Sequence, residues 1–166
     1  MIKKIRNKMF GHRFGAGFSF GITSAVITTL GLMVGLTSGT HSKLVVVGGV
    51  LTIAIADAFS DSLGMHISQE AQKKTTKEIW QATISTFFTK LCFALTFLIP
   101  ILLFELSAAV IINVLWGLML ITLFSATIAK QNKEKTWKVV AEHLIIAVVV
   151  VIISYFVGKF VDLVFE

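Results

Sequence analysis

Residues 44–67 read LVVVGGVLTIAIADAFSDSLGMHI, an apolar run that contains two carboxylates, Asp57 and Asp61. A helix of about 20 apolar residues crosses the hydrocarbon core of a bilayer, so this run is long enough to span it. Ionisable side chains at that depth are costly, and they usually face protein or water rather than lipid. The run therefore predicts a membrane-spanning helix, and its two acids are the first candidates for a functional site.

The composition of the chain also indicates an integral membrane protein. Of its 166 residues, 55% are hydrophobic and 14% are charged, which is more apolar surface than one soluble core could hide. A single Pro and a single Cys exclude a disulfide framework. At this length about five spans fit, with short connections and no separate soluble domain.

Five apolar runs, each bounded by charged or turn residues, are expected to span as helices. They cover about 14–36, 44–67, 83–104, 106–129 and 138–161. We therefore expect an all-α membrane protein, with residues 1–166 forming a single five-helix transmembrane domain. Pro100 is expected to end the third span near its outer end.

The basic residues are unevenly distributed between the connections. Twelve of the fifteen precede the first run, or lie between the second and third runs or between the fourth and fifth. The positive-inside rule then places the N-terminus in the cytoplasm and the C-terminus outside. This distribution accounts for the net charge of +6 without a nucleic-acid partner.

The first predicted helix has one narrow face of small and hydroxyl-bearing residues. Small residues four positions apart allow another backbone to approach closely, and hydroxyls can donate hydrogen bonds across the contact. We interpret the glycines as a seam for helix packing or dimerisation and the hydroxyls as the lining of a permeation path, two interpretations that are compatible. The face comprises Gly17, Gly21, Ser24, Thr28, Gly31, Gly35 and Gly39.

On the second helix, Asp57 and Asp61 share a face, and Met65 lies one turn beyond. Counting 1.5 Å per residue from the cytoplasmic edge puts Asp57 level with Ser24, near the middle of the bilayer. Carboxylates and hydroxyls suit magnesium, calcium or manganese, and a thioether shifts the preference toward iron(II). This pattern indicates a path for a divalent cation.

Lys90 in the third span is expected at the level of Asp61. It either extends to the membrane interface or pairs with Asp61, which would remove the cost of both charges. A paired lysine would occupy the place of a mobile cation, or act as a displaceable counterion that links transport to protons. Glu142, at the start of the fifth span, either joins this level or pairs with a loop lysine.

Three segments resemble the vacuolar iron transporter family of five-helix membrane proteins. Residues 21–25 (GITSA) are similar to the family's first-helix pattern Gly-x-Asn-Asp-Gly, and residues 56–64 (ADAFSDSLG) are similar to its second-helix signature. Residues 141–146 (AEHLII) with 155–158 (YFVG) are similar to its fifth helix. The resemblance implies a homodimer whose first helices line a path between subunits and export iron(II) or manganese(II) from the cytosol against protons.

The chain departs from the family pattern at the residues that matter most. Ser24 stands where the family has an Asp, Asp61 where it has a Met, and Met65 where it has a Glu. The connection between the second and third helices is also too short for the Glu-rich metal-binding domain of some members. Any carried-over metal site therefore depends on Asp57 and Asp61 as its acids.

We expect a dimeric, proton-linked exporter of iron(II) or manganese(II) rather than an enzyme, with no permanently bound cofactor. Asp57 and Asp61 would bind the ion, Ser24, Thr28 and Met65 would line its path, and Lys90 or Glu142 would modulate protonation. The alternative is a non-transporting membrane scaffold in which Asp61 and Lys90 form a fixed ion pair.

The expected partners are membrane lipid and a second copy of the chain. The expected location is the cytoplasmic membrane of a prokaryote or a vacuolar-type membrane of a eukaryote.

Overall fold

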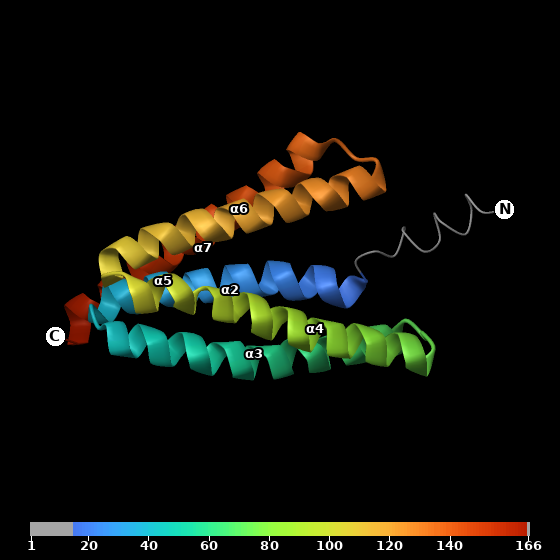
Figure 1. Ribbon diagram of the computed structural model, residues 1–166, viewed down its shortest axis with the longest axis horizontal. Coiled ribbons are helices and arrows are strands. Elements are labelled where there is room, and N and C mark those ends of the chain that lie inside the picture. Colours follow the sequence, from blue (N-terminus) through green and yellow to red (C-terminus); the bar gives the residue numbers. More distant parts are fainter. Residues whose placement is uncertain (1–14, 166) are drawn as a thin grey trace.

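The computed structural model of the chain describes residues 15–165, and these residues form six helices and no strand (Figure 1). Five helical spans are long and apolar enough to cross a membrane, and α4 and α5 together make the third. The predicted all-α fold with five membrane-spanning helices is therefore confirmed. The helices are α2 (Ala16–Thr40), α3 (Lys43–Ala71), α4 (Thr76–Thr96), α5 (Leu98–Leu103), α6 (Leu106–Asn132) and α7 (Thr136–Phe165).

Side chains cap the helices at two of the short turns. The Ser42 hydroxyl, before α3, accepts a hydrogen bond at 3.4 Å from the backbone N–H three residues later. Before α4, Thr75 and Glu78 form a capping box in which the Glu78 carboxylate accepts from the Thr75 amide at 3.0 Å. With this box as its N-terminal cap, α4 begins at Thr76 rather than near residue 83. The first turns of α4 are helical although their residues are polar.

The third span is interrupted between α4 and α5. Pro100 has no backbone N–H, so it cannot donate a helical hydrogen bond to the Thr96 carbonyl. The helix breaks at Phe97, and α5 then continues the span. The amide of Asn113, fully buried on α6, donates to the Phe97 carbonyl at 2.9 Å. Trp116 Nε1 donates to Thr96 Oγ1 at 3.1 Å. Pro100 therefore interrupts the span instead of ending it, and α6 holds the break.

Helix α2 is the centre of the bundle and contacts α3, α4, α6 and α7. Its Val26, Leu30 and Met33 are fully buried in the apolar core. The α6–α7 hairpin meets the other helices near the end where α7 finishes, and diverges from α2 and α4 toward the opposite end (Figure 1).

The small-residue face of α2 is divided between two partners within the same chain. Gly17 and Gly21 lie against α4, so that a Cβ on Gly17 would be 2.1 Å from an α4 carbonyl oxygen. Gly31 and Gly35 lie against Ser154 of α7. A Cβ added to Gly31 would lie 3.1 Å from Ser154 Oγ, and one added to Gly35 would lie 3.4 Å from the Ser154 carbonyl oxygen. The seam expected from the glycine spacing is thus a set of intramolecular helix contacts.

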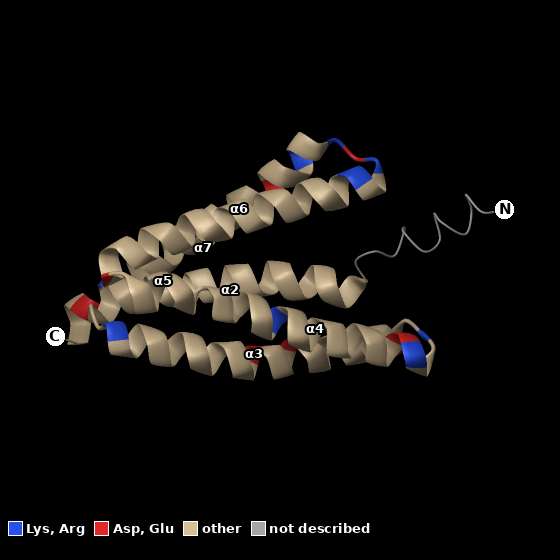
Figure 2. Cartoon of the chain, viewed as in Figure 1, with Lys and Arg blue, Asp and Glu red and all other residues tan. Residues whose placement is uncertain are grey.

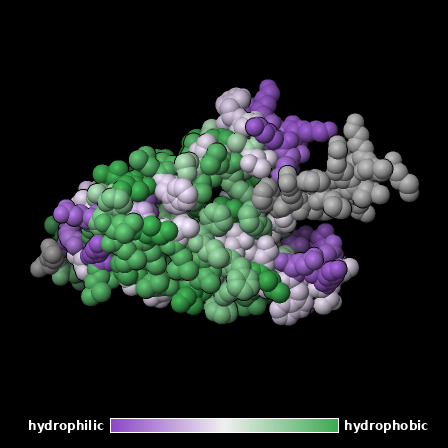
Figure 3. Space-filling view, in the orientation of Figure 1, coloured by the Kyte–Doolittle hydropathy of each residue, from purple (hydrophilic) through white to green (hydrophobic). Residues whose placement is uncertain are grey.

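Most charged residues lie at the two ends of the bundle, a few lie in its middle on α3 and α4, and apolar side chains cover most of the middle surface (Figures 2 and 3). We call the end with the α3–α4 and α6–α7 turns the lysine-rich end. The predicted cytoplasmic orientation of this end rests on its charge. Its lysines are Lys73, Lys74, Lys77, Lys130, Lys133, Lys135 and Lys138.

Replacing Gly158 by Ala tests the close contact between α2 and α7. A Cβ there would lie 2.0 Å from Ser38 Oγ and 2.3 Å from the Gly35 carbonyl oxygen. We expect Gly158→Ala to destabilise the protein by about 1–3 kcal/mol, as overpacking does. Gly48→Ala is the matched control because nothing lies near its added Cβ. Thermal unfolding in detergent should show a loss for the first variant only; equal melting temperatures would contradict this packing.

Candidate functional site

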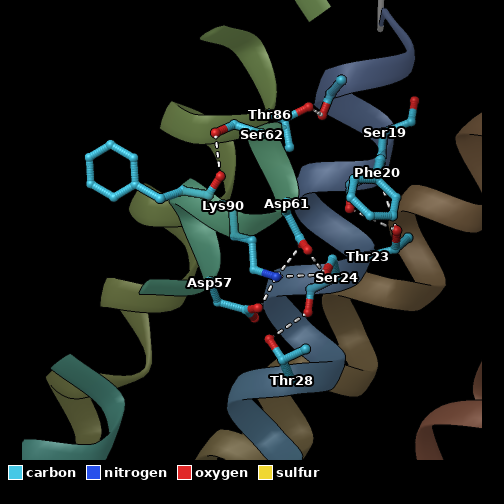
Figure 4. Close-up of polar contacts among 12 residues, drawn as sticks. Ser19, Phe20, Thr23, Ser24, Thr28, Asp57, Asp61, Ser62, Thr86 and Lys90 are labelled. Atoms are coloured by element: carbon cyan, nitrogen blue, oxygen red, sulfur yellow. Dashed lines mark hydrogen bonds and ion pairs between the residues drawn. The ribbon is translucent and has the colours of Figure 1, made fainter. Parts of the chain in front are cut away.

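Within residues 15–165, one cation is buried, the Lys90 ammonium of α4 at the centre of the apolar bundle. The residue is 1% exposed and its side chain points toward α3 (Figure 4). Its Nζ lies 2.5 Å from Asp57 Oδ2 and also pairs with Asp61 Oδ2. One ammonium therefore bridges two carboxylates that are one helical turn apart.

Ser24 of α2 completes this cluster. Lys90 Nζ donates to Ser24 Oγ at 2.7 Å, and Ser24 Oγ in turn donates to Asp61 Oδ2 at 2.5 Å. Charge-assisted hydrogen bonds of this kind are shorter and stronger than those between neutral groups. We call Ser24, Asp57, Asp61 and Lys90 the ionic cluster; it joins α2, α3 and α4.

The local sequence explains why these side chains meet. Asp57 and Asp61 are four residues apart, so both point from the same face of α3. Helix α4 approaches α2 closely because Gly21 leaves room for Thr89, to which an added Cβ would come within 2.9 Å. The next residue of α4 is Lys90, so this close approach carries the ammonium to the boundary between α2 and α3.

The three charged side chains differ in their access to the surroundings. The Asp57 and Asp61 side chains are 23% and 18% exposed, whereas that of Lys90 is 1% exposed. An ion that reaches the cluster would meet carboxylate oxygens first, with the ammonium behind them. Two carboxylates and a hydroxyl offer hard oxygen ligands for a cation. In residues 15–165 no group of three or more His, Cys, Asp and Glu side chains could hold a metal ion.

Hollows adjoin α2 on both sides of the ionic cluster. Toward the lysine-rich end, a hollow of about 510 Å³ is lined by Ser19, Thr23 and Met65, among others. Toward the opposite end, a mostly apolar groove of about 590 Å³ follows α2 from Ile27 to Thr40. Ile27 lines both hollows and lies three residues from Ser24. The ionic cluster therefore lies near the level of α2 that borders both hollows, although none of its four residues lines either hollow.

The structure brings together only part of the residue set expected from sequence. Ser24 contacts Asp61 rather than Asp57. Thr28 donates to the Ser24 carbonyl at 2.9 Å and lines the apolar groove. Met65 lies outside the ionic cluster, where its Sδ accepts a hydrogen bond from the Gln69 amide at 3.7 Å.

Glu142 is not brought to Lys90. Its side chain is exposed, and α7 packs on α2 and α6 rather than on α4. No hydrogen bond or ion pair joins the Glu142 carboxylate to another residue within 15–165.

The pair between Asp57 and Lys90 was missed by the sequence reasoning, which paired Lys90 with Asp61 alone. The spacing of the acids contained the signal. Carboxylates four residues apart on a helix are neighbours, so a lysine that reaches between them can contact both.

Replacing Lys90 by Met tests the balance of charge in the cluster. The variant leaves two carboxylates in the bundle without their cation, and breaking a buried ion pair in this way costs about 3 kcal/mol or more. We expect a lower melting temperature in detergent, with recovery when Asp57→Asn and Asp61→Asn are added. Asp162→Asn with Lys90→Met is the control, because it removes an acid away from the cluster. Equal recovery by this control would contradict the assigned pairing.

Comparison with known proteins assigns no family: the chain matches no protein-family model and no curated protein sequence.

Proposed function

We propose that this chain is a proton-linked transporter of a divalent cation, iron(II) or manganese(II), and that Asp57 and Asp61 bind the ion. The observation that carries the proposal is the Lys90 ammonium held between two carboxylates deep in an apolar bundle. Ionisable groups within membrane spans commonly mark ion or proton pathways. In this proposal the ammonium occupies the site when the transported cation is absent.

The composition of the cluster supports exchange between the two cations. Displacing the ammonium would leave two carboxylates and the Ser24 hydroxyl as ligands, and a divalent ion would balance both negative charges. In this proposal the displacement of the Lys90 ammonium by the ion is the step that links transport to protons.

The surroundings of the cluster support a path and a class of metal. Met65 lines the hollow on the lysine-rich side, one turn from Asp61, and its thioether favours softer ions such as iron(II). Thr28 lines the groove on the other side. Glu142 has no role in this scheme, because its side chain lies outside the cluster.

The resemblance to the vacuolar iron transporter family supplies the remaining parts of the proposal. These are export from the cytosol, a homodimer, and a location in the cytoplasmic membrane of a prokaryote or a vacuolar-type membrane of a eukaryote. Asp61, at the family's Met position, would take over as ligand where Ser24 replaces the first-helix acid.

The ion pairs themselves favour one alternative, a non-transporting scaffold. Lys90 forms ion pairs with both carboxylates, and Ser24 donates a hydrogen bond to Asp61. The cluster can therefore also act as a fixed link between α2, α3 and α4. A scaffold requires no ion flux, and this difference separates the two functions.

Flux through proteoliposomes tests the proposal. We expect an imposed manganese(II) gradient to move protons, reported by an enclosed pH-sensitive dye, and Asp57→Asn with Asp61→Asn to reduce this signal about tenfold or more, the effect of losing at least 1.4 kcal/mol of ion stabilisation. Asp162→Asn, an acid outside the cluster, should retain the signal. Absence of metal-dependent proton movement in the wild-type protein would contradict transport and leave the scaffold, and full activity of the double variant would contradict the assignment of Asp57 and Asp61 as ion ligands.

A further inference from the structure

We propose that the outer face of α3 and α4 binds an anionic phospholipid at the lysine-rich end, a site separate from the ionic cluster. The feature is a groove of about 840 Å³, which we call the aromatic groove. Its lining is mostly apolar, from Phe59 and Leu63 of α3 and Trp80, Ile84, Phe87 and Phe88 of α4, and its polar members are Ser60, Ser62, His66 and Thr83.

The aromatic groove faces away from the core of the bundle. Ala54 and Ala58 of α3 are buried at 1% and 0% exposure, whereas Phe59 and Leu63 are 62% and 60% exposed. The Phe59 and Phe87 rings are 4.8 Å apart and fix the wall where the two helices meet. In a bilayer this surface meets hydrocarbon, and its shape and composition suit an acyl chain.

The end of the aromatic groove toward the α3–α4 turn is polar. Thr83 Oγ1 donates to the Ile79 carbonyl at 2.8 Å, so it accepts from His66 Nδ1 at 3.0 Å. With Nδ1–H as the donor, the neutral imidazole presents Nε2 as an acceptor, which suits a hydroxyl of a lipid headgroup rather than its phosphate. The Trp80 ring lies 5.0 Å from the imidazole, and its indole N–H is a donor of the kind found at the level of lipid headgroups.

Positive charge adjoins this polar end. Lys77, Trp80 and Ile84 are among the residues that line a second hollow of about 670 Å³, which shares Trp80 and Ile84 with the aromatic groove. The neighbouring acid Glu78 accepts hydrogen bonds from Thr75 in the capping box. Lys77 is therefore placed to pair with a phosphate at the membrane surface, where each basic residue strengthens attraction to anionic lipid.

Charge favours a lipid over a second copy of this chain as the occupant. A two-fold axis through the aromatic groove, parallel to the membrane normal, would bring the same patch of both copies together. Lys73, Lys74 and Lys77 of one copy would then approach their equivalents, which is unfavourable. An anionic headgroup supplies the opposite charge, and its acyl chain fills the apolar part.

Fluorescence of Trp80 tests the site in a variant that carries Trp116→Phe and Trp137→Phe. The protein is reconstituted in phosphatidylcholine vesicles that contain a minority of brominated phosphatidylglycerol, or the same amount of brominated phosphatidylcholine. We expect the anionic lipid to quench Trp80 more strongly. Lys77→Gln should reduce this preference about fivefold, as loss of one basic residue at an anionic surface does.

Lys135→Gln is the matched control, because it removes the same charge from the other turn of the lysine-rich end. It should retain the preference measured at Trp80. Equal quenching by the two brominated lipids, or an equal effect of Lys77→Gln and Lys135→Gln, would overturn the proposal. Disulfide-linked dimers of Leu63→Cys in a Cys92→Ser background would also overturn it, in favour of a second copy. None of these outcomes bears on ion flux, which is measured in a separate experiment.

Discussion

The cost of charge in hydrocarbon is the constraint on which this structure depends. Lys90 is buried in the middle of the bundle, and an ammonium there needs anionic and hydroxyl partners within reach. Asp57, Asp61 and Ser24 supply them from two other helices, so α2, α3 and α4 are held in one relative position. The close approach of α4 to α2 at Gly21 brings the ammonium within reach of these partners.

The spans and the acids were predictable from sequence because hydropathy and charge are local properties. The features that escaped prediction depend on contacts between distant segments. The break at Phe97 is held by Asn113 of α6, and Asp57 shares the ammonium because α4 lies at one particular height against α3. Glu142 is an acid within a predicted span, which made it a candidate site residue, but the packing of α7 keeps it away from α4.

Helices α3 and α4 connect the two sites that we propose. One face of this pair carries the ionic cluster toward α2, and the opposite face carries the aromatic groove toward lipid. Any movement of α4 that withdraws Lys90 from the acids would also change the spacing of the groove walls. The break at Phe97 lies on the same span as both sites, and Asn113 of α6 holds it through a hydrogen bond to the Phe97 carbonyl.

In the proposed function, the Lys90 ammonium occupies the place of the transported cation. The most direct test measures manganese(II) binding to the purified protein through the decrease of the free ion's electron paramagnetic resonance signal. We expect Lys90→Met to bind manganese(II) more tightly than the wild-type protein, and the addition of Asp57→Asn and Asp61→Asn to remove this binding. A folded Lys90→Met protein that binds the ion no better than the wild type would contradict the proposed role of Lys90.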